Sequence, residues 1–268
     1  MTASGPASPA STADAYSRGS AAWASGPVRI YGHLAELLVA ASPVPLSGRR
    51  CCDVGSGTGA ASAALRQVGA QVVATDFAPG MLMLDRAGRP PAAVADATAL
   101  PFADASLDGV VAAYCYNHLT EPVGGFREAR RVCRAGSPVL ASSYALDDTH
   151  PVKDAVERTM IELGWEVPAP YIEIKNDAVP KLATVERCKQ VAVSAGLRDI
   201  EVTALRMPFP ELGVDDLIEW RMGMAQIAWF VETLTPAQRA AAVDRSRELL
   251  GDNVAPLERS VIHIVGIA

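Results

Sequence analysis

The chain has 268 residues, 50% of them hydrophobic and 20% charged, and its net charge at pH 7 is -6. This length can bury one large α/β core, and the acidic balance argues against nucleic acid as a partner because phosphate binding needs clustered Lys and Arg. The sequence has no uninterrupted run of about 18 apolar residues and no basic leader followed by an apolar segment. We therefore expect a cytoplasmic protein that does not bind a membrane.

The five cysteines are scattered along the chain, and none forms a Cys-x-x-Cys pair. Cys51 and Cys52 fall inside an apolar run. This spacing predicts reduced core cysteines rather than disulfides or a zinc site. No cluster of His, Asp and Glu suggests another metal, so we expect none.

The N-terminal region divides into a tail and a helical cap. Residues 1–14 are rich in Ser, Ala, Pro and Gly and have little to bury, which predicts disorder. Within residues 15–48, Tyr31, Leu34 and Leu38 recur at helical spacing and predict an amphipathic helix.

Strands and helices alternate over residues 49–144, the predicted cofactor half. Apolar runs predict strands at residues 49–54, 71–76, 92–96, 107–113 and 137–144. Helices are expected at residues 60–68, 79–87 and 121–134. Continuous apolar strands alternating with helices are typical of a parallel sheet that is covered on both faces, whose ligands bind at the C-terminal ends of the strands.

The second half is less regular. Helices are expected at residues 151–163, 184–195, 215–230 and 236–250, strands at 200–205 and 260–267, and an irregular Pro-containing stretch at 164–180. We expect a single domain over residues 15–268. Residues 145–183 and 206–257 would be helical insertions that form a lid.

A glycine turn follows the first strand, in the sequence Asp53-Val54-Gly55-Ser56-Gly57-Thr58-Gly59. Glycine tolerates positive φ and has no Cβ, so the backbone can approach a ligand closely. A turn between a buried strand and a helix N-terminus also directs free N–H groups at that ligand. This predicts a nucleotide-type cofactor site. On its own, the turn also fits the loose dinucleotide pattern Gly-x-Gly-x-x-Ala.

Three acids end three successive predicted strands: Asp53, Asp76 and Asp96. Asp76 follows the glycine turn by about twenty residues, the distance at which a carboxylate can accept from ribose hydroxyls. Asp96 is placed to accept from an amine such as that of adenine, and Asp53 to face the other end of the cofactor. A single Asp at a strand end is commonly a turn former or helix cap. Three Asp residues at the ends of successive strands, next to a glycine turn, favour a cofactor site.

Together these motifs resemble the class I S-adenosylmethionine-dependent methyltransferases, specifically their UbiE-like small-molecule group. The resemblance covers about residues 49–144. It rests on the turn at 53–59, on Thr75-Asp76-Phe77-Ala78-Pro79-Gly80-Met81-Leu82, on Ala95-Asp96-Ala97 with Leu100-Pro101-Phe102, and on Phe126-Arg127-Glu128-x-x-Arg131-Val132-x-Arg134-Ala135-Gly136. Cys133, Ala135 and Ser137 depart from the family pattern in the last of these.

The resemblance implies S-adenosylmethionine as cofactor. It also implies a Rossmann-like, doubly wound seven-stranded sheet whose last strand is antiparallel. The cofactor-binding residues that it implies are Asp53, Gly55, Ser56, Gly57, Gly59, Asp76, Phe77, Met81, Asp96, Ala97 and Tyr114. Among them, Phe77 and Met81 would pack on the adenine, and Tyr114 would lie near the sulfonium.

Methyl transfer needs a general base only where the acceptor must lose a proton. His118, just after the fourth predicted strand, is the best candidate by its location and its pKa near neutrality. A histidine that caps or packs the next helix would look the same in the sequence. His33, His150 and His263 are weaker candidates by location.

The acceptor pocket should come from the helical cap and the insertions, where aromatic residues gather. The candidate substrate-binding residues are Tyr16, Trp23, Tyr31, Tyr144, Trp165, Tyr171, Trp220, Arg221 and Met224. Taken singly, each is better explained as a core residue. Collectively they favour an apolar, aromatic acceptor.

We therefore expect a methyltransferase of secondary metabolism, a monomer or homodimer, that methylates C, N or O of a small aromatic or heteroaromatic molecule such as an indole or phenol. A quinone-pathway C-methyltransferase is the near alternative. A cyclase or regulator that binds the cofactor without methylating is a further one, since fold does not fix function. A nucleic-acid methyltransferase is disfavoured, because the only basic cluster (Arg127, Arg130, Arg131 and Arg134) resembles a solvated helix face.

Overall fold

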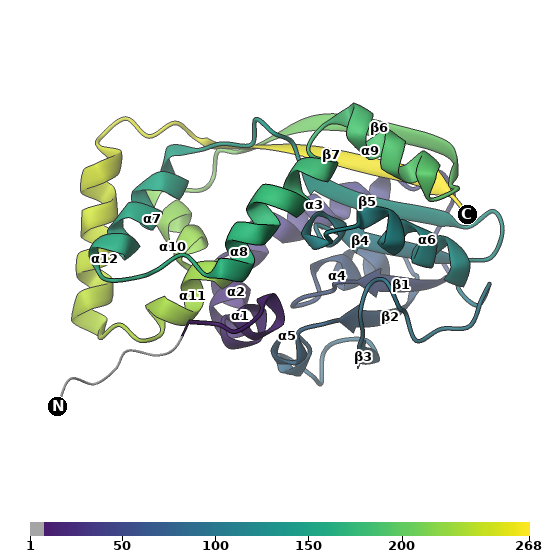
Figure 1. The fold of residues 1–268 in the computed structure, drawn as a ribbon, viewed down its shortest axis with the longest axis horizontal. Helices are drawn as coiled ribbons and strands as arrows, with labels where there is room; N and C mark the ends of the chain where they lie inside the picture. Colours follow the sequence, from purple (N-terminus) through teal and green to yellow (C-terminus); the bar gives the residue numbers. More distant parts are fainter. Residues whose placement is uncertain (1–7) are drawn as a thin grey trace.

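The computed structural model describes residues 8–268 (Figure 1). Part of the tail expected to be disordered is helical, because α1 (Thr12–Arg18) begins inside it. The Ser11 hydroxyl caps this helix by accepting from the Asp14 N–H at 3.2 Å. The expectation for residues 1–7 lies outside the described residues.

The core of the molecule is a seven-stranded sheet in the order β3-β2-β1-β4-β5-β7-β6. The first five strands run parallel, and β7 is antiparallel to both of its neighbours, β5 and β6. This confirms the predicted Rossmann-like sheet. The strands are β1 (Arg50–Val54), β2 (Gln71–Asp76), β3 (Ala92–Val94), β4 (Gly109–Ala113), β5 (Pro138–Tyr144), β6 (Arg198–Phe209) and β7 (Leu257–Ile267).

Two pairs of helices cover the two faces of this sheet. Alternate residues of a strand point to opposite faces, so Cys51 packs with α3 (Val28–Ala40) and α4 (Ala60–Gln67), whereas Cys52 packs with α6 (Pro122–Val132) and α9 (Val185–Ser194). The five cysteines are unpaired. The predicted helix at residues 79–87 is shorter, because α5 (Pro79–Met83) ends where Leu84 turns extended.

The inserted helices gather at one end of the molecule, away from β1 to β3 (Figure 1). They are α7 (Pro151–Glu162), α10 (Val214–Met222), α11 (Ala225–Val231) and α12 (Pro236–Leu250). The stretch expected to be irregular is largely helical: α8 (Ala169–Glu173) continues into single turns at Ile174–Ala178 and Val179–Leu182. No helix in residues 8–268 has the length and apolarity needed to cross a membrane.

The helix predicted at residues 215–230 is broken in two between α10 and α11. Met224 is extended, with ψ 138°. The N-terminal cap packs tightly at this break: a Cβ on Gly223 would lie 2.8 Å from the Ala22 carbonyl oxygen and 2.8 Å from Pro27 Cδ. The break therefore lets α2 (Ser20–Ser25) pack beside α11.

Candidate active site

One large cavity, of about 1110 Å³, opens at the C-terminal ends of the parallel strands and extends under the inserted helices. Asp53 and Asp76 lie at the ends of β1 and β2, Tyr114 follows β4, and Tyr144 ends β5. The cavity thus joins the glycine turn to the insertions and the N-terminal cap. This is the edge of a parallel sheet at which ligands bind.

Most of the residues singled out in the sequence line this cavity. Of the expected cofactor-binding residues, all but Gly59 do so, and His118 does as well. Gly59 instead forms the N-cap of α4 with φ 101°. Of the expected acceptor residues, all but Trp165 line the cavity. Trp165 is 2% exposed and donates its indole N–H to the Gln226 carbonyl at 3.1 Å, so its position is that of a core residue.

The glycines of the turn serve different purposes. Gly55 has φ 66°, and a Cβ there would lie 2.4 Å from Cys115 Sγ, so this glycine allows the turn to pack against the loop after β4. Gly57 has φ 51° and faces open space, because a Cβ there would meet nothing within 4 Å. The backbone at Gly57 is therefore free to approach a ligand.

Asp76 ties the turn to β2. Its Oδ2 accepts from the Gly57 N–H at 2.7 Å, and its Oδ1 accepts from the Ala78 N–H at 2.8 Å. Burial raises the pKa of Asp76, although these backbone hydrogen bonds oppose the rise. Each carboxylate oxygen can accept a further hydrogen bond from a ligand.

Asp53 is an acceptor with one oxygen unused. Its side chain is 1% exposed, and burial raises its pKa to about 6. Oδ2 accepts from the Ser62 hydroxyl at 2.6 Å, whereas Oδ1 is enclosed without a partner. Asp53 lines the cavity, so this oxygen is available to accept from a donor or positive charge of a ligand.

Sequence reasoning missed Arg89, which lies behind the turn. Its Nη2 donates to Ser56 Oγ at 3.1 Å and to the Gly57 carbonyl at 3.2 Å. Its charge also lowers the pKa of Asp53 and of Asp76, against the effect of burial. No local pattern distinguishes this arginine from others, because its partners lie in the turn some thirty positions earlier.

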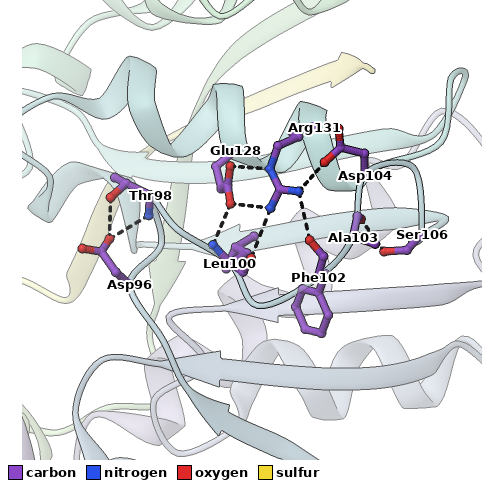
Figure 2. Close-up of polar contacts among 9 residues, drawn as sticks. All are labelled: Asp96, Thr98, Leu100, Phe102, Ala103, Asp104, Ser106, Glu128 and Arg131. Carbon is purple, nitrogen blue, oxygen red and sulfur yellow. Dashed lines mark hydrogen bonds and ion pairs between the residues drawn. The ribbon is translucent and has the colours of Figure 1, made fainter.

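Asp96 and the loop after β3 are held by a polar network (Figure 2). Asp96 Oδ1 accepts from both the N–H and the hydroxyl of Thr98, at 2.7 Å each. Farther along the loop, Glu128 accepts from the Leu100 N–H at 2.7 Å, and Arg131 donates to the carbonyls of Leu100 and Phe102.

The network corrects one expectation about α6. Arg131 is not on a purely solvated face: its guanidinium also pairs with Glu128 at 2.6 Å and Asp104 at 2.6 Å (Figure 2). The Glu-x-x-Arg spacing places both side chains on one side of the helix, where they bind the backbone of the loop. This role explains why the two residue types occur at that spacing.

Aromatic rings form a continuous wall along the cavity. Phe77 and Tyr16 are 6.1 Å apart between ring centroids, Tyr16 and Trp23 are 5.6 Å apart, and Trp23 and Tyr31 are 4.9 Å apart. Tyr31 meets Tyr114 edge-on at 5.4 Å. Tyr114, held at φ 54°, then stacks on Tyr144 at 4.4 Å. The wall runs from the residue expected on the adenine to the inserted helices.

His118 lies at the Tyr16 end of this wall. Tyr16 Oη and His118 Nε2 are 3.4 Å apart, and His118 Nδ1 is enclosed without a partner. Burial lowers the pKa of His118 to about 4, so the imidazole is neutral at pH 7. The neutral imidazole is able to accept a proton, but its lowered pKa makes it a weak base.

Arg259 on β7, which sequence reasoning did not single out, lies among several of the expected acceptor residues. Arg259 is 3% exposed and forms a two-pronged ion pair with Asp148, at 2.9 Å for both bonds. Its guanidinium lies 4.0 Å from the Tyr144 ring centroid and 4.9 Å from that of Trp220. Arg221, 5% exposed, pairs with Glu157 on α7.

The first end of the cavity fits S-adenosylmethionine. The unpartnered Asp53 oxygen matches its ammonium group, the open backbone at Gly57 admits close approach, and Asp76 and Asp96 can accept from ribose and adenine donors. The expected adenine neighbours Phe77, which is 42% exposed, and Met81 also line this end.

Comparison with known proteins agrees with this fit. The family described as "Methyltransferase domain" matches residues 52–141. A demethylmenaquinone methyltransferase of Clavibacter sepedonicus is 36% identical over 169 residues, which cover 59% of this chain and 69% of that protein. Demethylmenaquinone methyltransferases of Renibacterium salmoninarum and Beutenbergia cavernae match over a shorter segment, 42% of their own length.

Solved structures share the fold at low sequence identity. Phosphoethanolamine N-methyltransferase 2 of Haemonchus contortus, in complex with S-adenosyl-L-methionine, is 19% identical with a TM-score of 0.54 over 88% of this chain and 52% of that one. A putative methyltransferase from an antibiotic biosynthesis pathway of Anabaena variabilis is 16% identical, with a TM-score of 0.60 over 88% and 97% of the two chains.

The fold, the site and the relatives define a class I S-adenosylmethionine-dependent methyltransferase, with S-adenosylmethionine as its cofactor. Within that class the chain belongs to the UbiE-like group, which includes the demethylmenaquinone methyltransferases.

Proposed function

We propose that the protein methylates a ring of a small aromatic or quinonoid acceptor. The observation that carries the proposal is the aromatic wall that leads from the cofactor residues into the inserted helices. Aromatic side chains favour flat, apolar ligands, and a few enclosed polar groups would fix the orientation of the ring.

S-adenosylmethionine, when bound, supplies a methyl group on a positively charged sulfur, which is already reactive. The protein's task is then to position the acceptor and keep water out. Tyr31, Tyr114 and Tyr144 are buried or half-buried and would hold the acceptor ring. The enclosed Asp53 would orient the methionine end of the cofactor.

His118 is the proposed base for acceptors that lose a proton. Its imidazole lines the cavity and is neutral because burial lowers its pKa to about 4. Tyr16, 3.4 Å from Nε2, would orient the ring. Loss of a general base should lower kcat by about 10²-fold or more. A His118→Gln variant whose turnover stays within about threefold of wild type would make His118 a structural residue, and Tyr16→Phe should have a smaller effect than His118→Gln.

Two acceptor types compete. The relatives favour a quinone-pathway ring, since those that match are demethylmenaquinone methyltransferases. The family match, however, ends at residue 141 and leaves out the inserted helices that line the acceptor end of the cavity. A compact natural-product acceptor such as an indole or phenol is the second candidate, on the strength of those helices.

Mass spectrometry can decide between them. The protein is incubated with S-adenosylmethionine labelled with deuterium in the methyl group and with a panel that contains demethylmenaquinone, phenols and indoles. A labelled methyl on one of these establishes the acceptor type. Cofactor binding without transfer to any acceptor would favour a non-methylating cyclase or regulator. Binding of NAD in place of S-adenosylmethionine would contradict the proposal. Action in the cytoplasm on a free small molecule, as a monomer or homodimer, stays a prediction.

A further inference from the structure

The acceptor end of the cavity contains buried charge that the methyl-transfer site does not use. It lies between the end of β5, the start of β7 and helices α7 and α10. Three cations and two carboxylates meet there: Arg259, Lys153 and Arg221, with Asp148 and Glu157. Other charged residues of the cavity rim, such as Asp154, Glu173 and Asp177, are exposed and solvated.

The charges at this end do not cancel. Arg221 is matched by Glu157, and its guanidinium can also donate to the Gln226 side-chain oxygen at 2.9 Å. Asp148, in contrast, serves two cations: it bonds Arg259 at 2.9 Å and Lys153 at 2.8 Å, and it also accepts from the Ser260 N–H. Asp148 is therefore shared by two cations. Lys153 is partly exposed to water, whereas Arg259 is 3% exposed, so the shortage of negative charge is unfavourable at Arg259 unless an anion joins it.

Arg259 also keeps an unused donor. Its Nε and Nη2 bind Asp148, but Nη1 is enclosed without a partner. Tyr144 Oη and Trp220 Nε1, which belong to the two rings beside this guanidinium, are likewise enclosed without partners. Three unpaired donors from three elements thus belong to side chains that pack against one another around the Arg259 guanidinium. Since buried donors are rarely left unpaired in native proteins, this points to a ligand group that accepts several hydrogen bonds.

We infer that the methyl acceptor carries a carboxylate, and that Arg259, between Tyr144 and Trp220, is the residue that binds it. The inference rests on the proposed function, because it names a property of the acceptor at the same site. It favours the second of the two acceptor types, a compact natural product, because demethylmenaquinone carries no carboxylate. A carboxylate matches the fork of an arginine and accepts from neighbouring O–H and N–H groups. Because Nη1 is enclosed, a side chain beside it must shift as the anion enters. The same charge balance disfavours a positively charged group at this end of the cavity.

The test compares acids with their amides, which have the same shape but no charge. Protein saturated with S-adenosylhomocysteine is titrated by calorimetry with indole-3-acetate and indole-3-acetamide, and with 4-hydroxyphenylacetate and its amide. A charge-assisted hydrogen-bond pair should make at least one acid bind about tenfold or more tightly than its amide. Equal binding of acid and amide in both pairs, or no binding of either acid, overturns the inference.

Variants link the preference to Arg259. Arg259→Lys keeps the charge that Asp148 needs but loses the fork, so the preference for the acid should fall several-fold, with S-adenosylhomocysteine binding unchanged. Arg206→Lys is the matched control, because Arg206 is exposed on β6 and pairs with Asp147 and Glu258 outside the cavity. An acid preference that survives Arg259→Lys, or a loss of S-adenosylhomocysteine binding in that variant, contradicts the inference. Failure of the wild-type protein to bind S-adenosylhomocysteine would instead overturn the proposed function.

Discussion

Ser62 binds one oxygen of the buried Asp53 carboxylate, at 2.6 Å, and leaves the other oxygen without a partner. Burial raises the pKa of this carboxyl to about 6. The group is thus poised to change its charge within the range in which enzymes are assayed, and the group proposed to bind it, the ammonium of the cofactor, is a cation.

Cofactor affinity should therefore depend on pH. If the ionised carboxylate binds the cofactor ammonium, affinity for S-adenosylhomocysteine falls as pH drops through 6, by about tenfold between pH 7 and pH 5. Calorimetric titration measures this directly. Asp53→Asn should bind weakly with little pH dependence. Ser62→Ala removes a hydrogen bond that lowers the Asp53 pKa, so its transition should move to higher pH. A pH-independent wild type would contradict the assignment.

His118 should make stability pH-dependent in the opposite sense to Asp53. A histidine with a lowered folded pKa binds fewer protons in the native state between about pH 4 and its unfolded value of about 6.5, so the stability that it contributes is lost as pH falls through that window. Asp53, with a raised folded pKa, makes stability fall as pH rises from about 4 to 6.

Urea unfolding of wild type and His118→Gln at several pH values separates the two effects, since Asp53 is common to both. The stability difference between the proteins should shift in favour of His118→Gln as pH decreases from 7 to 4. A constant difference would show that His118 is not buried as described.

Two glycine substitutions should differ in their cost. Gly55→Ala forces a Cβ to within 2.4 Å of Cys115 Sγ and 2.7 Å of Cys115 Cβ, in addition to the strain of a positive φ. Gly57→Ala adds only the strain, about 1–2 kcal/mol, because its Cβ meets nothing. Thermal unfolding should show the larger loss for Gly55→Ala. Both substitutions should weaken cofactor binding. Equal melting temperatures of the two variants would contradict the packing difference between Gly55 and Gly57.

Arg131, in the last turn of α6, should be more important for stability than the exposed Arg134, which lies two residues beyond the end of that helix. Arg131→Lys loses the forked hydrogen bonds to Leu100, Phe102 and Glu128, which should cost about 1–2 kcal/mol. Arg134→Lys, which affects a pair with Asp108, should cost less. Chemical unfolding measures both. Because the loop also carries Asp96, only Arg131→Lys should weaken cofactor binding.

The sequence predicted what depends on local patterns. The β1–turn–α4 unit, the acids at 53, 76 and 96, and α12 at residues 236–250 follow from apolar runs, glycines and caps that are close together in the chain. The break at Gly223 was missed because it depends on packing by the N-terminal cap. The Arg259–Asp148 pair was missed because its members are 111 positions apart. Hydrophobic periodicity along the sequence does not predict a contact between residues so far apart in the chain.

The position of β7 governs the order in which the protein can assemble. This strand lies inside the sheet, between β5 and β6, yet it follows both of them in the sequence. On a ribosome, which delivers the chain from its N-terminus, β1 to β5 can pair early, while β6 has no neighbour in the sheet until β7 emerges. Arg259 arrives on that strand. A nascent chain would thus acquire its cofactor crevice first and its acceptor pocket last.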